Sequence, residues 1–227
     1  MMKLYHYVHC PFCVRVRLAC DFLSIKYESI VLTYDDEKTP ISLSGKKMLP
    51  ILLDGKNAIN ESLEIIKFLD SEDSLNQKFY LTNKPYVDKV LEKIGFDIHS
   101  LAMPYWVYTP EFDEESRMYF KNKKEVKRGA FNHLVLNRET YIKSLISTLE
   151  EVDINIDGFF LSRKFSILDI LLYSHLVAGY VVPGMNFTQK ISEYMQRVEN
   201  DTGFQYHSDF WKSNEDFSSL IRKSNEK

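Results

Sequence analysis

The chain has 227 residues, of which 44% are hydrophobic and 27% are charged, and its formal net charge at pH 7 is -3. These proportions exclude an intrinsically disordered chain and a small protein held together by disulfides. The near-neutral charge supplies no field that would attract a polyanion, so we expect no nucleic acid among the partners. The length allows two small domains.

Three cysteines occur, and two of them, Cys10 and Cys13, are too close in sequence to close a structural loop. This odd number argues against a secreted disulfide framework. Residues 1–8 leave no room for the apolar stretch of a signal peptide before the pair, so we expect a cytoplasmic protein. Residues 167–182 are the most apolar stretch but contain Asp169 and are shorter than the roughly 20 residues of a spanning helix, so we expect no membrane contact.

The first seventy residues alternate extended and helical patterns. Asp54-Gly55 is a two-residue turn signal between two extended segments, which predicts a hairpin. The predicted elements are a strand at 3–8, a helix at 11–24, a strand at 25–32, a hairpin at 51–53 and 56–59, and a helix at 61–69. They predict the order β-α-β followed by β-β-α.

The second part of the chain reads as helical. Residues 71–85 are polar and irregular, which indicates a linker. Three- and four-residue apolar spacing then predicts helices at 86–101, 114–127, 138–152, 166–180 and 188–200, with breaks at Pro104, Pro110, Gly129, Gly158 and Pro183. We therefore predict a first domain at 1–72, a linker at 73–85 and a helical domain at 86–227.

Cys10-Pro11-Phe12-Cys13 follows a predicted strand and opens a predicted helix, which is the context of a thioredoxin-like redox motif. The free N–H groups and the positive end of the helix dipole favour a thiolate there, with a pKa of about 3.5 to 7.5. Pro11 suits the first helical position, where its missing N–H needs no partner. We expect an exposed Cys10 to attack disulfides and a more buried Cys13 to resolve the mixed disulfide.

The alternative for a C-x-x-C pair is half of a zinc site. No second pair lies at ligand spacing, so we favour redox chemistry and expect no metal. We expect Cys20 to be a core residue. His9, which we expect to be exposed beside Cys10, could tune its charge.

Two further motifs follow the cysteine pair: Leu49-Pro50 just before the hairpin, and Glu61-Ser62 at the start of a helix. In this order, the three motifs are similar to the glutathione site of glutaredoxins and glutathione transferases. The resemblance implies an α/β thioredoxin-like N-terminal domain plus an all-α C-terminal domain, the glutathione-transferase-like architecture.

The resemblance also implies roles for these residues. Pro50 would be cis and the backbone of Leu49 would pair with the cysteinyl part of glutathione, beside Pro11 and Phe12 of the motif. Glu61 and Ser62 would hold the γ-glutamyl end, since a helix start is a ready carboxylate site. The alternative for Glu61-Ser62 is a plain helix cap.

The second half resembles the helical domain of the glutaredoxin 2 type. Ser166 and Asp169 form a predicted capping box at the start of an apolar helix. The segments 119–125 and 175–179 also resemble this type. Phe12 departs from the pattern, where Tyr is more usual, and so does the tail from 203 to 227, which we leave unassigned.

Several cations could serve the site or simply be solvated. Arg15, Arg17 and Lys47 could attract the carboxylates of glutathione. A basic run follows a set of acids and reads as a solvated helix face rather than a docking patch, and its members are Lys121, Lys123, Lys124, Lys127 and Arg128.

The sequence thus predicts a monomeric glutathione-dependent thiol-disulfide oxidoreductase that reduces oxidised or glutathionylated proteins. One alternative is a cysteine-type glutathione transferase or dehydroascorbate reductase, which needs Cys10 but not Cys13. Another is a non-catalytic interaction module that binds glutathione or an iron-sulfur cluster.

Overall fold

A computed structural model of the protein describes residues 1–206. The unassigned tail falls almost wholly outside the described residues. Within them, no helix combines the length and the apolar character needed to cross a membrane.

The N-terminal half is built on a four-stranded sheet with the order β2-β1-β3-β4. β1 pairs in parallel with β2, while β3 runs antiparallel to both β1 and β4. The parallel pair needs a crossover, which helix α1 supplies, and the tight turn at Gly55 (φ 60°) joins the antiparallel pair. The bounds are β1 Lys3–His6, α1 Pro11–Phe22, β2 Glu28–Val31, β3 Ile51–Asp54, β4 Asn57–Asn60 and α3 Ser62–Leu69. The predicted β-α-β, β-β-α order is confirmed.

A short helix between β2 and β3 escaped the sequence analysis. α2, Lys38–Ser44, begins where the Asp36 carboxylate accepts a hydrogen bond from the Thr39 N–H at 2.9 Å, and it ends at Gly45 with φ 74°. These are ordinary start and stop signals. The helix has too few apolar residues to show a periodic pattern, which is why it was missed.

The C-terminal half is mostly helical. Its elements are α4 Gln77–Trp106, α5 Glu114–Arg128, α6 Phe131–Leu136, α7 Arg138–Ile154, α8 Ile167–Leu176, the 3-10 helix η1 Val177–Val181 and α9 Gln189–Thr202. A two-stranded hairpin, β5 Ile156–Asp157 with β6 Phe159–Phe160, corrects the prediction that this half is all-α. The five predicted helices are all present, and the short α6 was not predicted.

The predicted linker and the predicted break at Pro104 are wrong in their details. α4 begins at Gln77, within the predicted linker, and runs through both Pro85 and Pro104 before it ends at Trp106. A proline inside a helix costs about 3 kcal/mol. Beyond Pro85 the helix buries a long apolar face, including Val87, and each such residue contributes about 1.5 to 3 kcal/mol, so packing outweighs this cost.

The predicted capping box at the start of α8 is confirmed. The Ser166 hydroxyl accepts a hydrogen bond from the Leu168 N–H at 3.2 Å, and the Asp169 carboxylate accepts one from the Ser166 N–H at 2.8 Å. Asp169 also accepts from the Phe160 N–H at 2.8 Å, which ties the β5–β6 hairpin to the helix.

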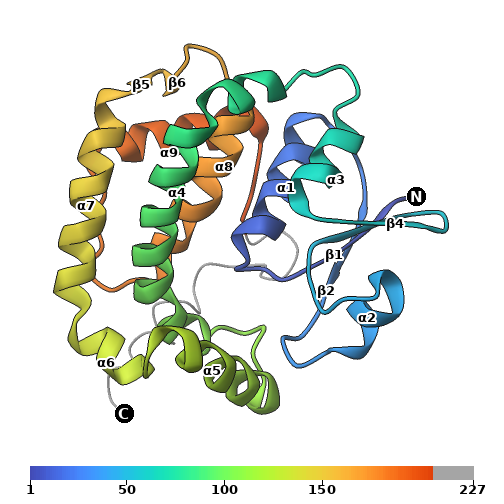
Figure 1. Cartoon of the computed structure of the whole chain (residues 1–227), viewed down its shortest axis with the longest axis horizontal. Helices are drawn as coiled ribbons and strands as arrows, with labels where there is room; N and C mark the ends of the chain where they lie inside the picture. Colours follow the sequence, from blue (N-terminus) through green and yellow to red (C-terminus); the bar gives the residue numbers. More distant parts are fainter. Residues whose placement is uncertain (207–227) are drawn as a thin grey trace.

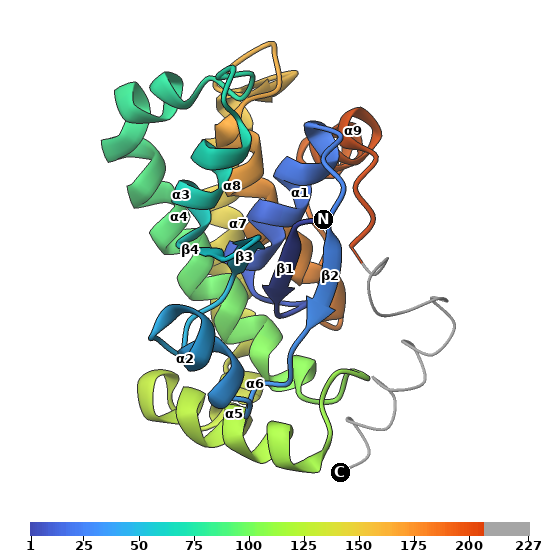
Figure 2. The same ribbon diagram turned by 90° about the vertical axis from the view of Figure 1, so that its right-hand side faces the viewer.

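The two halves share one hydrophobic core. Helix α1 lies between the sheet and α8, with α3 beside it (Figures 1 and 2). The core therefore runs without a break from Leu18 on α1 to Leu172 on α8 and Ile94 on α4. A smaller cluster, which includes Tyr7, Cys13 and Leu49, surrounds the start of α1.

Candidate active site between the two halves

Cys10 lies at the very start of α1. Its backbone is extended (φ -72°, ψ 120°), and its carbonyl accepts the hydrogen bond from the Val14 N–H at 2.9 Å. Pro11 is the first residue of the helix, as predicted. Cys13 lies one turn further on and is completely buried, and its Sγ accepts a hydrogen bond from the Tyr7 N–H at 3.4 Å.

The two thiols differ in acidity. A hydrogen bond from the Cys13 thiol, helped by the backbone N–H groups of Cys13 and Phe12 and by the charge of Lys124, lowers the pKa of Cys10 to about 7 against the effect of burial. Burial and the neighbouring Cys10 raise the pKa of Cys13 well above its ordinary value. At neutral pH Cys10 is therefore the more ionised of the two thiols, and Cys13 holds its proton.

Cys10 opens onto a cavity of about 390 Å³ between the two halves. Cys10, Pro11, Phe12 and Leu49, all predicted site residues, line this cavity, whereas Cys13, Pro50, Glu61 and Ser62 are outside its lining. The Leu49–Pro50 peptide bond is cis, as the resemblance implied. The structure therefore brings half of the predicted set together at one wall.

Glu61 and Ser62 lie at the start of α3. Glu61 has φ 77° and ψ 118°, a conformation that a residue other than glycine rarely adopts, and its side chain makes no capping hydrogen bond. Ser62 is buried. The geometry therefore does not fit a plain helix cap, and a strained backbone of this kind is typical of functional sites.

Helices α4 and α5 supply the opposite wall of the cavity. From α4 come His99, Met103 and Trp106, and from α5 come Tyr119, Phe120, Lys123, Lys124, Lys127 and Arg128. None of the α4 residues was predicted, because nothing in their local pattern distinguishes them from a core helix. Four members of the predicted solvated face thus line the cavity, while the exposed Lys121 is outside its lining.

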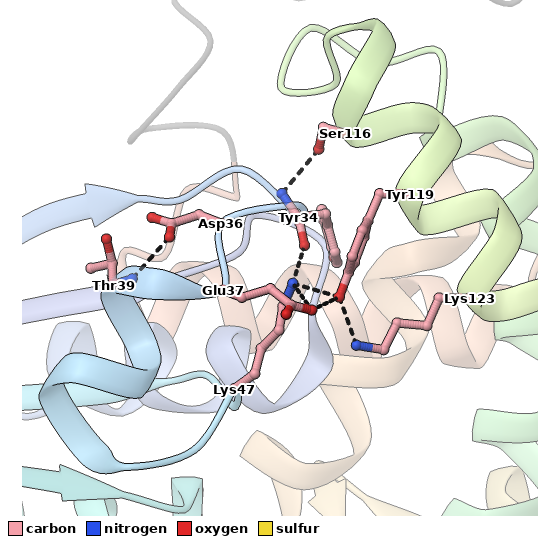
Figure 3. A network of polar contacts seen from close by, with 8 residues as sticks. All are labelled: Tyr34, Asp36, Glu37, Thr39, Lys47, Ser116, Tyr119 and Lys123. Atoms are coloured by element: carbon pink, nitrogen blue, oxygen red, sulfur yellow. Dashed lines mark hydrogen bonds and ion pairs between the residues drawn. The ribbon is translucent and has the colours of Figure 1, made fainter.

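A polar network ties the loop after β2 to α5 at the cavity (Figure 3). The Lys47 ammonium donates to the Tyr34 carbonyl and to the Tyr119 hydroxyl, each at 2.7 Å, and lies 3.4 Å from the Glu37 carboxylate. Tyr119 in turn donates to Glu37, and Lys123 donates to Tyr119 at 2.8 Å. Lys47, one of the three cations considered for the site, therefore lines the cavity but is held by protein groups.

Stacked aromatic rings lie beside this network, and two of them, Tyr7 and Tyr34, line the cavity. The rings of Tyr7 and Tyr34 stack with centroids 4.0 Å apart, and Tyr34 stacks on Phe112 at 4.9 Å. Burial raises the pKa of both tyrosines, so their hydroxyls stay neutral. The sequence analysis missed Tyr7 and Tyr34, which a strand end and a loop carry without any motif.

His9 is buried, which corrects the expectation that it is exposed; it is only 2% exposed. Its Nδ1 lies 2.7 Å from the Tyr206 hydroxyl, its Nε2 lies 3.0 Å from the Thr109 hydroxyl and contacts Glu111, and its ring stacks on Trp106 at 5.1 Å. His9 therefore links the segment just before Cys10 to the helical half.

Arg15 and Arg17 are buried and do not line the cavity with Cys10. Arg15 donates to Ser174 at 3.3 Å and lies 3.0 Å from His175 Nε2. Arg17 donates to the Tyr206 carbonyl at 2.7 Å. The Arg15 guanidinium also lies 4.6 Å from the centroid of the Phe12 ring, which lines the cavity. A contact of either arginine with glutathione stays a prediction.

Cys20 is completely buried, as predicted, and burial raises its pKa to about 12. All three cysteines are free. Among residues 1–206 no cluster of three or more His, Cys, Asp or Glu side chains could hold a metal ion.

Two family models and a curated relative match this chain. The family described as Glutaredoxin 2, C terminal domain, matches residues 86–210, and the Glutathione S-transferase, N-terminal domain, matches residues 4–77. Glutaredoxin 2 of Escherichia coli K12 is 31% identical over 209 residues, covering 88% of this chain and 95% of the relative.

Solved structures agree. Glutaredoxin 2 from Salmonella typhimurium, in complex with glutathione, superposes with a TM-score of 0.80 at 29% identity over 97% of this chain and 99% of the other. A glutathione transferase from Phanerochaete chrysosporium reaches 0.77 at 16% identity, over 90% of this chain and 98% of the other, which shows the shared fold alone. Since one family match spans more than half of the chain and the Escherichia coli relative is similar over nearly its whole length, the chain belongs to the glutaredoxin 2 family and is an enzyme of that family.

Proposed function

We propose that this glutaredoxin reduces protein disulfides and glutathione mixed disulfides through the dithiol of Cys10 and Cys13. The Cys10 thiolate attacks one sulfur of the substrate disulfide, a new S–S bond forms at Cys10, and the electron pair of the broken bond leaves with the other sulfur as a thiolate. The lowered pKa of Cys10 at the wall of the cavity is the observation that carries this proposal.

The mixed disulfide on Cys10 can be resolved in two ways. When a protein is attached, Cys13 loses its proton and attacks Cys10, which releases the protein thiolate and leaves a Cys10–Cys13 disulfide. When glutathione is attached, a second glutathione attacks that glutathione sulfur, which releases oxidised glutathione and frees Cys10. The Cys10–Cys13 disulfide left by the first route is reduced back to the dithiol by two glutathione molecules, which are oxidised to one glutathione disulfide.

Glutathione is the proposed co-substrate, and the glutathione complex of the Salmonella relative supports this. In this chain the backbone of Leu49, beside Pro50, would pair with the cysteinyl part, and Glu61 and Ser62 would bind the γ-glutamyl end. The strained backbone of Glu61 and the absence of a capping hydrogen bond favour this role over a cap.

The cavity is completed by both halves of one chain, so we propose that the protein works as a monomer. The three free thiols suit a reducing cytoplasm. We also propose that the chain is divided into domains at 1–72 and 86–227. Its proposed substrates are proteins.

Two variants test the proposal. Cys10→Ser should abolish activity on both a glutathionylated peptide and a protein disulfide, since Cys10 attacks in each reaction. Cys13→Ser should keep deglutathionylation and lose most reduction of the protein disulfide. Cys13→Ser with full activity on both substrates would favour the transferase or dehydroascorbate reductase alternative, and wild type inactive on both would favour the interaction module.

A further inference from the structure

The α5 side of the cavity is strongly cationic. Lys123, Lys124, Lys127 and Arg128 line it together, with Lys47 on the facing side. No carboxylate is found among the described residues that line this cavity. A cavity with such walls attracts anions, because low-dielectric surroundings focus the field.

The cations at this wall differ in their polar partners among residues 1–206. Lys47 and Lys123 share the Tyr119 network, which contains Glu37. Arg128, by contrast, donates to the Phe96 carbonyl at 2.9 Å and the Ser100 hydroxyl at 3.0 Å.

Lys124 lies 5.3 Å from the centroid of the Phe120 ring. No ion pair to Lys124, Lys127 or Arg128 occurs within the described part of the chain. Among residues 1–206, therefore, no carboxylate neutralises these three cations by an ion pair.

The charge of Lys124 is felt at the reacting sulfur. It favours the thiolate of Cys10. Burial lowers the pKa of Lys124, and the Cys10 thiolate offsets part of this effect. A group on the far side of a disulfide that Cys10 attacks would enter the same field. Trp106, Met103 and Phe120 border this space, so water screens the field less than at an open surface.

We propose that the α5 wall, formed by Lys124, Lys127 and Arg128, selects disulfide substrates whose departing half carries a negative charge near its sulfur. The inference rests on the proposed function and adds the chemical class of the preferred acceptor. When Cys10 takes the glutathione sulfur of a mixed disulfide, the other half leaves as a thiolate. A carboxylate on that half would lie against the α5 cations.

The test uses three mixed disulfides of glutathione whose other half is HS–CH₂–CH₂–X, with X a carboxylate, a hydroxyl or an ammonium group. The glutathione moiety is constant, so only the charge of the departing half changes. Each kcat/KM is measured with glutathione as reductant, and wild type is compared with Lys127→Gln. Lys121→Gln, an exposed position on the same helix outside the cavity lining, is the matched control.

We expect the ratio of kcat/KM for the carboxylate over the ammonium substrate to fall by about three- to tenfold in Lys127→Gln at low ionic strength. Comparing ratios between two proteins cancels the intrinsic reactivity of each disulfide. Lys121→Gln should keep the wild-type ratio. In wild type the ratio should shrink at about 1 M salt, where the screening length is about 3 Å.

Two outcomes would overturn the inference. A carboxylate-to-ammonium ratio that is the same in wild type, Lys127→Gln and Lys121→Gln would show that the α5 wall does not sense the departing half. A rise in the KM for glutathione that is equal for all three substrates would assign the wall to glutathione itself. In both cases activity on the hydroxyl substrate still supports the proposed function, while its absence in wild type would refute that function separately.

Discussion

Cys10 owes its acidity first to the neighbouring thiol. The hydrogen bond from Cys13 stabilises the thiolate most, and the backbone N–H groups and Lys124 add to it. The sequence analysis attributed the effect to the helix start alone, which accounts for the N–H groups but not for the leading cause. Cys13 therefore has an electrostatic effect on Cys10 in addition to the resolving role proposed for it.

The first prediction concerns this hydrogen bond. The rate of alkylation of Cys10 by iodoacetamide should follow a titration centred near pH 7 in wild type. Cys13→Ala removes the donor, so the thiolate loses stabilisation and the midpoint should rise by about one to two units. Cys13→Ser keeps an O–H donor and should shift less. Equal midpoints for all three proteins would show that Cys13 does not set the pKa.

Glu61 has a backbone conformation that its side chain disfavours. At φ 77° a side chain is strained by roughly 1 to 3 kcal/mol, whereas glycine is not. Strained residues of this kind cluster at functional sites, which agrees with the proposed contact between Glu61 and glutathione. Stability and function should therefore respond in opposite directions to its removal.

Glu61→Gly should leave the free energy of unfolding unchanged or raise it by up to about 1 kcal/mol, since released strain offsets the added freedom of the unfolded chain. The KM for glutathione should rise at the same time. Glu64→Gly, an exposed position inside α3, is the matched control and should cost about 1 kcal/mol with the KM unchanged. Urea denaturation and steady-state kinetics measure both quantities, and a loss of stability in Glu61→Gly would contradict the strain argument.

At the scale of the elements, the start of α8 is the junction that organises the helical half. Asp169 accepts hydrogen bonds from two buried backbone N–H groups, one in the helix cap and one in the β5–β6 hairpin. The long helix α4 then packs along both α7 and α8. The Asp169 carboxylate therefore joins the start of α8 to the β5–β6 hairpin, and α4 packs on the helix that it caps.

Asp169→Ala should lower the free energy of unfolding by about 3 kcal/mol, because it leaves two buried donors without an acceptor. Ser166→Ala removes a single capping acceptor and should cost about 1 kcal/mol. Glu150→Ala, at an exposed position of α7, should stay within about 0.5 kcal/mol of wild type. Urea unfolding of the three variants tests the order, and a cost for Asp169→Ala no larger than for Glu150→Ala would rule out the junction.

At the scale of the whole molecule, the two halves are joined by a common core and by polar contacts from both sides. His9 reaches Thr109, Glu111 and Tyr206, while Lys47 reaches Tyr119. Lys47, Tyr119 and Trp106, whose ring stacks on His9, all line the candidate active-site cavity. Separation of the halves would therefore take the cavity apart.

We predict that the halves unfold together. In a Cys10→Ser, Cys13→Ser, Trp211→Phe background, alkylation of Cys20 reports on the N-terminal half, and the fluorescence of Trp106 reports on the helical half. Both side chains are buried, so neither signal changes until the structure around it opens. The urea midpoints should coincide. Midpoints separated by more than their error would show that the halves are independent domains.

Much of the molecule followed from signals that act over a few residues. The cysteine pair between a strand and a helix, the Asp54-Gly55 turn and the Ser166–Asp169 capping box were all read correctly. Each depends on hydrogen bonds or turn geometry within about one helical turn. Such patterns carry their own physical cause, so the sequence by itself determined the β-α-β, β-β-α order of the first seventy residues and the place of the cysteine pair at a helix start.

The tertiary structure alone decided what depends on distant residues. α4 continues through Pro85 because its buried face packs on α7 and α8, and His9 is buried because Thr109 and Tyr206 lie around it. Lys124 and Lys127 read as a solvated face until α5 is placed beside Cys10. Burial and electrostatic fields depend on distance in space, and more than a hundred residues separate Cys10 from these lysines along the chain.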